Sequence, residues 1–133
     1  MINEVSLLEF SKSEYARFND ASYSSNNPEV EYRNCARVAY YSLYHLLKDI
    51  ADGLPGQYEQ NIGSHERVIR KLMTFGDDNQ KLFAEKLKSQ RAIRVSADYN
   101  LKHPFRKSEA YKSLRYAESV FALVAESSES ATG

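Results

Sequence analysis

The chain has 133 residues, enough for one domain with a core of its own. Hydrophobic residues make up 42% and charged residues 27%, and this composition excludes an intrinsically disordered chain. Lys and Arg together number 18, as do Asp and Glu, so any basic surface for nucleic acid has to be local.

The single cysteine, Cys35, excludes an internal disulfide and a thiolate metal site, and we expect it to be a small residue at a helix contact. No apolar run approaches the roughly 20 residues that cross a bilayer, and the N-terminus lacks the pattern of a secretory signal. We therefore expect a cytoplasmic protein without a membrane-spanning segment.

Prolines and glycines divide the chain into amphipathic stretches that predict four or five helices. The expected helices comprise residues 3–22, 28–52, 65–75, 78–99 and 107–125. Short connections between long helices favour an up-and-down antiparallel bundle, so the fold class is all-α. Residues 1–125 form the single domain, and the Ser-rich residues 126–133 are expected to be a flexible tail.

Residue types at the ends of these stretches predict how the helices begin and stop. Asn27 is placed to cap the helix that begins at Pro28, since Asn accepts a hydrogen bond from the first turn and proline suits its first position. Gly53 is expected to end this helix in the left-handed conformation, and Ser64 to cap the third helix. The core face of the fourth helix is expected to consist of Leu82, Phe83, Leu87, Ile93 and Ala97.

Four side chains recur at every fourth position of the second helix: Arg33, Arg37, Tyr41 and His45. Such spacing places them in one slanting stripe, and Tyr44 flanks it. Guanidinium, phenol and imidazole groups on one stripe can hold phosphates and stack on bases. An equally supported alternative is that the stripe is a half-exposed helix face, with its tyrosine rings packed against the bundle.

Arg91, Arg94 and Asp98 share one face of the fourth helix. A carboxylate in the last helical turn opposes the helix dipole, so Asp98 needs a cation nearby. We expect a buried or half-buried Arg–Asp–Tyr cluster between the second and fourth helices, which either sets the helix register or lines a site.

The three histidines, His45, His65 and His103, lie far apart in the sequence, and no pair has metal-ligand spacing on one helix. No glycine-rich phosphate loop or nucleophile elbow occurs either. We therefore expect neither a metal nor another cofactor.

Two segments resemble a known family. Residues 36–45, Ala-Arg-Val-Ala-Tyr-Tyr-Ser-Leu-Tyr-His, are similar to the A-x-x-A-Y-Y-A-x-F-H stretch of small prokaryotic HEPN-like proteins, and Ser64-His65 then heads a short helix. Residues 90–99, Gln-Arg-Ala-Ile-Arg-Val-Ser-Ala-Asp-Tyr, resemble the family's R-x-x-x-D-Y motif at the end of a long helix. The resemblance covers residues 28–125 and implies a helical bundle that often forms homodimers. It also implies nucleotidyltransferase partners, toxin–antitoxin pairs, RNA cleavage or defence against phage.

Catalytic members of this family carry an Arg that is followed, about four to six residues later, by the His with which it cleaves RNA without metal. Here seven residues separate Arg37 from His45, and eight separate Arg94 from His103. We therefore expect a HEPN-like module that is not catalytic and that acts with a protein partner, binds RNA or a nucleotide, or does both, in a toxin–antitoxin or phage-defence setting. The candidate ligand-binding residues are Arg33, Tyr41, Tyr44, His65, Arg91, Arg94, Asp98 and Tyr99.

Two alternatives stay open. The first is a metal-independent ribonuclease with Arg37 and His45 as catalytic residues, assembled across a dimer if necessary. The second is a structural dimerisation subunit in which both segments serve packing alone.

Overall fold

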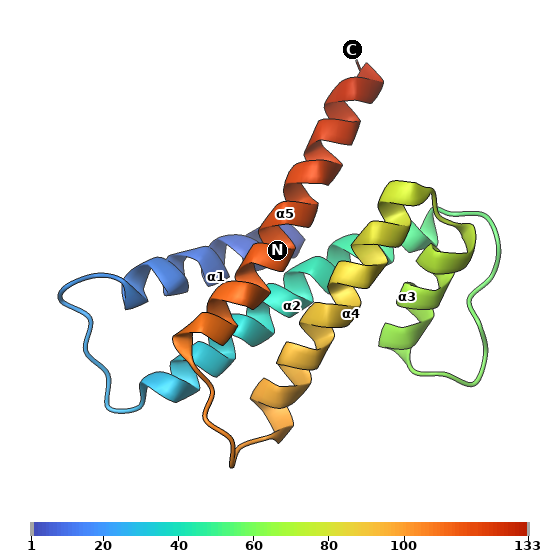
Figure 1. The fold of residues 1–133 in the computed structure, drawn as a ribbon. Helices are drawn as coiled ribbons and strands as arrows, with labels where there is room; N and C mark the ends of the chain where they lie inside the picture. Colours follow the sequence, from blue (N-terminus) through green and yellow to red (C-terminus); the bar gives the residue numbers. More distant parts are fainter. Residues whose placement is uncertain (1, 133) are drawn as a thin grey trace.

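Five α-helices and no β-strand make up residues 2–132, the part of the chain that the computed structural model describes, with side chains described for residues 2–127 (Figure 1). The helices are α1 (Glu4–Phe18), α2 (Pro28–Asp52), α3 (Ser64–Phe75), α4 (Asp78–Tyr99) and α5 (Lys107–Thr132). The all-α prediction is confirmed. None of the described helices is both long and apolar enough to span a membrane.

The bounds of α2 and α4 agree with the prediction, whereas other helix ends differ from it. α1 stops at Phe18 rather than at Ser22, because the Asp20 carboxylate draws the following backbone into a turn and accepts the Ser22 N–H at 2.8 Å. α5 continues to Thr132 because no glycine or proline interrupts it after residue 125. The flexibility of residues 126–133 stays a prediction, and Gly133 lies outside the described residues.

Of the three predicted caps, one is confirmed and two are wrong. The Asn27 side chain accepts a hydrogen bond from the Val30 N–H, as expected of an N-cap. Gly53 does end α2, but its φ of −82° is right-handed, because Gly53 is the C-cap itself and the left-handed conformation belongs to the residue after the cap. Ser64 is the first residue of α3, and the extended residue before that helix is Gly63.

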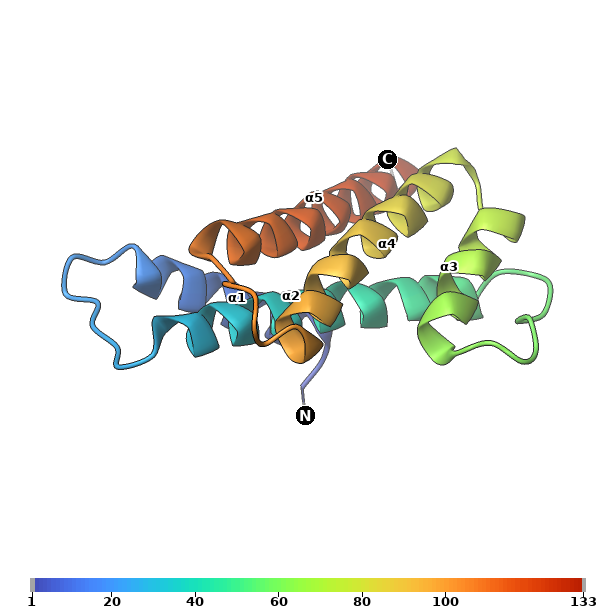
Figure 2. The ribbon, with the colours of Figure 1, turned by 60° about the horizontal axis from the view of Figure 1, so that its bottom comes forward.

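α2 lies at the centre of the bundle. Figures 1 and 2 show α1, α4 and α5 packed along it, with α3 at one end beside α2 and α4. Within the predicted core face of α4, Phe83, Leu87 and Ala97 are buried. The prediction for Leu82 is wrong, since its side chain is 47% exposed. Successive helical residues diverge by about 100° around the axis, and Phe83 takes the inward position instead.

Small buried polar side chains join the other helices to the middle of α2. Ser11 of α1 donates to the Cys35 carbonyl at 3.0 Å, and Ser113 of α5 donates to the Ala36 carbonyl at 2.9 Å. Gln90 of α4 in turn donates to the Ser113 carbonyl at 2.8 Å. Since unpaired polar groups are costly in a core, these bonds set the register of three helices. Cys35 is fully buried and burial raises the pKa of its thiol, so its predicted packing role is confirmed.

The connection between α3 and α4 gives a test of local packing. A Cβ at Gly76 would lie 2.4 Å from the Leu72 carbonyl oxygen, a backbone atom that cannot move without disturbing the end of α3. We expect Gly76→Ala to lower the free energy of unfolding by about 2 kcal/mol, measured by urea denaturation. Gly63→Ala is the matched control, because nothing lies within 4 Å of the added Cβ, and it should stay within about 0.5 kcal/mol of the parent. Equal effects of both changes would contradict the packing argument.

Candidate functional site

Arg33 extends from α2 to the C-terminal end of α4. Its Nη1 donates to the carbonyls of Ser96 at 3.0 Å and Ala97 at 2.8 Å, and its Nη2 donates to those of Asn100 at 3.3 Å and His103 at 2.7 Å. The last carbonyls of a helix have no partner within it and carry partial negative charge. A side chain from another helix therefore supplies the cap that α4 needs.

Glu29 completes the surroundings of Arg33. Its carboxylate accepts from Nη2 of Arg33 at 2.8 Å and from the Phe105 N–H at 2.9 Å, while the Arg33 guanidinium lies 5.2 Å from the centre of the Phe105 ring. All three guanidinium nitrogens of Arg33 thus donate to protein oxygens, and the residue is only 6% exposed. Arg33 was predicted to bind a ligand, but its hydrogen bonds join α2 to the end of α4. Spacing within one helix could have indicated the pair with Glu29, four residues earlier, whereas the bonds to the end of α4 join positions more than sixty residues apart and have no local signal.

Asp98 links two arginines near the end of α4. One carboxylate oxygen accepts from Nε of Arg37 at 2.7 Å, and the other accepts from Nη1 of Arg94 at 3.3 Å. Arg94 also lies over the rings of Tyr40 and Tyr41, 5.2 and 5.9 Å from their centres. The predicted Arg–Asp–Tyr cluster between α2 and α4 is therefore present, with the cations that offset the position of Asp98 against the helix dipole.

Arg94 is the least satisfied charged group in this cluster. It is only 8% exposed, and in the described part of the chain Nη1 alone among its three nitrogens has a hydrogen-bond partner. Burial by itself lowers the pKa of Arg94, but the hydrogen bond to Asp98 and the electrostatic effect of the Tyr41 and Tyr40 hydroxyl groups raise it more. The net pKa lies above its ordinary value, so the group stays a cation.

His65, at the start of α3, joins the cluster through a stack of rings. Its ring lies 4.4 Å from that of Tyr44 at an angle of 27°, and its Nδ1 is 2.5 Å from the Tyr40 hydroxyl. Burial raises the pKa of Tyr40, so this hydroxyl keeps its proton at neutral pH and can donate to Nδ1. Burial, followed by the charges of Arg94 and Arg91, lowers the pKa of His65. The imidazole is therefore neutral at pH 7. We call Tyr40, Tyr41, His65, Arg94 and Asp98 the Arg94 cluster.

Two other predicted residues lie at the edge of this cluster or away from it. Arg91 pairs with Glu66 of α3 at 3.2 Å, and both side chains are 35% exposed. Tyr99 is 74% exposed and takes part in none of the contacts described above.

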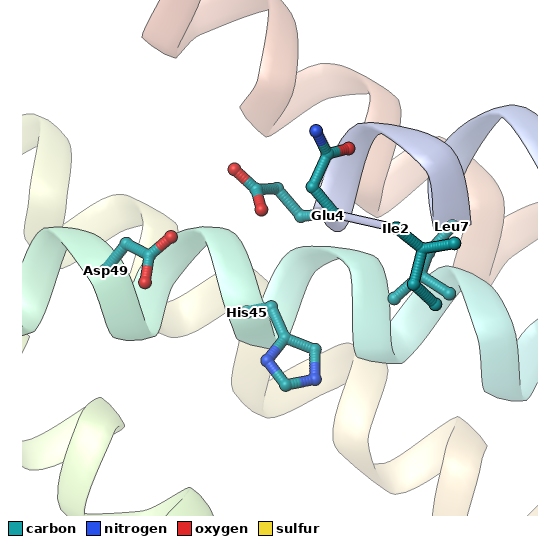
Figure 3. Close-up of a pocket in the computed structure, with 6 residues that line it drawn as sticks. Ile2, Glu4, Leu7, His45 and Asp49 are labelled. Atoms are coloured by element: carbon teal, nitrogen blue, oxygen red, sulfur yellow. The ribbon is translucent and has the colours of Figure 1, made fainter.

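The His45 ring lies between two tyrosines of α2 and a separate cavity, with its centre 5.3 Å from that of Tyr44 and 6.4 Å from that of Tyr41. It lines a cavity of about 380 Å³ whose wall also includes Asp49 from α2 and Glu4 from α1, as Figure 3 shows. Arg37 is held by Asp98 and by the Asn34 side chain, at 3.1 Å from Nη1. Within residues 2–127 no three His, Cys, Asp or Glu side chains come together as a metal site requires.

Fold and site together define an all-α protein with a buried cationic and aromatic cluster between α2, α3 and α4. No protein-family model, no curated protein and no solved structure matches the chain.

The role of Arg33 can be tested by stability. Arg33→Met removes the cap of α4 and the ion pair with Glu29, which keeps only its bond from the Phe105 N–H, and we expect it to lower the free energy of unfolding by about 3 kcal/mol. Arg106→Met, at an exposed position before α5, should change stability little. Urea denaturation followed by circular dichroism measures both. Equal stability of the two variants would show that the contacts at the end of α4 contribute nothing.

The lowered pKa of His65 predicts a pH dependence. Because the folded protein binds this proton more weakly than the unfolded chain, the stability contributed by neutral His65 is present above pH 6.5 and is lost as the pH falls from there towards the folded-state pKa. Between pH 7.5 and pH 5.5 the parent should thus lose more unfolding free energy than His65→Gln. The matched control His103→Gln, at an exposed position, should follow the parent. A parent and His65→Gln with the same pH profile would contradict the argument.

Proposed function

We propose that this chain is a HEPN-like, up-and-down antiparallel helical module that binds a phosphate group of RNA or of a nucleotide at the Arg94 cluster and acts with a protein partner, without catalysing a reaction. The observation that carries the proposal is the guanidinium of Arg94, which is buried, charged and bonded through one nitrogen of three.

An incompletely bonded buried cation is unusual, because most buried polar groups have partners and an unpaired one costs about 1–3 kcal/mol. Its present bond to Asp98, at 3.3 Å, is longer than the 2.7–2.9 Å typical of a charge-assisted hydrogen bond. A phosphate oxygen is the acceptor that a guanidinium group pairs with best apart from a carboxylate. Of the two Arg94 nitrogens without a partner among the described residues, Nε is fully buried, so a phosphate would bond to Nη2.

The surroundings of Arg94 favour the same ligand. Arg37 and Arg91 lie beside it with side chains 43% and 35% exposed, so both can turn towards an anion. Tyr41 is half-buried and His65 neutral, and rings of this kind stack on bases.

The contacts of Arg37 and His45 support binding rather than cleavage. An acid–base mechanism needs the histidine and the phosphate-holding arginine at one site. Here His45 lies eight positions after Arg37, about 12 Å along α2, and it borders the cavity beside Glu4 and Asp49. The expected homodimer and the nucleotidyltransferase or toxin–antitoxin partner stay part of the proposal, on the basis of the family resemblance alone.

Binding of a fluorescein-labelled single-stranded RNA in EDTA, followed by anisotropy, tests the proposal. We expect Arg94→Gln to weaken binding about tenfold, because it removes the buried charge. Arg94→Lys should retain part of the affinity, since lysine keeps the charge but loses the planar fork. Arg106→Gln, which removes one exposed charge elsewhere, is the matched control, and circular dichroism checks that each variant is folded.

Equal weakening by Arg94→Gln and Arg106→Gln would mean that binding depends on overall charge, and the proposed site would be wrong. Gel analysis of the same mixtures tests the alternative function. Cleavage by the parent that His45→Ala abolishes would replace the binding proposal with the ribonuclease one.

A further inference from the structure

α4 and α5 run side by side (Figures 1 and 2), and a depression in the surface lies over them. It is a cavity of about 290 Å³, close to the lower limit for small-molecule sites. Its lining residues are Lys86, Tyr111, Lys112, Arg115, Tyr116 and Ser119. None of them belongs to the Arg94 cluster.

The lining is cationic although the chain as a whole is neutral. Three of its six side chains carry positive charge, and none of the described lining residues is Asp or Glu. Lys86 and Lys112 make no ion pair with the described residues. Arg115 pairs only with Glu118, at 3.6 Å and with its own side chain 55% exposed, and such a pair is weak in water. The three cations are therefore free to neutralise an external anion.

The same cavity offers an aromatic surface. Tyr111 is 46% exposed, and its ring rests against that of Tyr15 from α1, with ring centres 5.4 Å apart. Lys107 in turn lies 5.8 Å from the centre of the Tyr15 ring. A ring that is braced on one side and open on another can stack on a base without losing much conformational freedom.

We propose that this cavity binds a nucleoside polyphosphate, with its phosphates between Lys86, Lys112 and Arg115 and its base against Tyr111. Three cations that line one open depression match a group that carries several charges on neighbouring phosphates. A nucleic-acid strand instead spaces single charges along its length. Two kinds of ligand carry a base with several linked phosphates: a free nucleotide and the 5′-triphosphate end of an RNA.

Isothermal titration calorimetry with ATP, tripolyphosphate and adenosine tests the proposal on the full chain in EDTA. ATP should bind most tightly, tripolyphosphate more weakly because it lacks a base, and adenosine should bind at least about tenfold more weakly than ATP. The double variant Lys112→Gln/Arg115→Gln should weaken ATP binding about tenfold. Tyr111→Ala should weaken ATP but not tripolyphosphate, while Tyr111→Phe keeps the ring and the affinity. Lys88→Gln, at an exposed position of α4 outside the lining, is the matched control for charge.

Comparison of a short RNA bearing a 5′-triphosphate with the same RNA bearing a 5′-hydroxyl identifies the source. Tighter binding of ATP than of the triphosphate RNA supports a free nucleotide, and the reverse order supports an RNA end. No saturable ATP binding, or equal binding of ATP and adenosine, would overturn the proposal. So would ATP binding that Arg94→Gln removes and the double variant leaves intact, a result that would place the nucleotide at the Arg94 cluster instead.

Discussion

The bonds between the Arg33 guanidinium and the carbonyl end of α4 hold the rest of this structure in place. They join a residue near the start of α2 to the segment of chain after the end of α4, and they satisfy helix carbonyls that would otherwise depend on water. Because Arg33 is buried, the bonds also determine how far α4 can slide along α2. Asp98, in the last turn of α4, is thereby placed opposite Arg37.

This register of α4 against α2 also places the Asp98 carboxylate between Arg37 and Arg94. Asp98 lies where the helix dipole disfavours a carboxylate, and two arginines offset that cost. Sharing one carboxylate leaves Arg94 with fewer hydrogen bonds than its burial would normally require. Arg33 and Arg94 are thus both buried, but they differ in how many of their guanidinium nitrogens have hydrogen-bond partners. The first has all its guanidinium nitrogens bonded within the chain, whereas the second has one nitrogen bonded among the described residues.

Much of the helical architecture could be predicted because its signals are local. Asn27 and Pro28 mark the start of α2, and the spacing of Arg94 and Asp98 within one helix predicts their pairing. Gly53 and Leu82 show where local signals fail. The conformation of Gly53 depended on whether the helix stopped at that residue or one before it, and the exposure of Leu82 depended on which neighbour turned inward. Nothing in the spacing of Ser11 or Ser113 indicates that each bonds to a carbonyl of α2.

The sequence by itself determined the all-α class, the extent of α2 and α4, and the arginine, tyrosine and aspartate side chains that share their faces. These properties depend on residues within a turn or two of each other, and helix geometry relates such residues directly. Only the tertiary structure decided that Arg33 caps α4, that His65 stacks on Tyr44, and that Lys86 and Arg115 line one cavity. Each of these contacts joins two helices, so it depends on how the apolar faces pack around α2, which spacing along one helix does not specify.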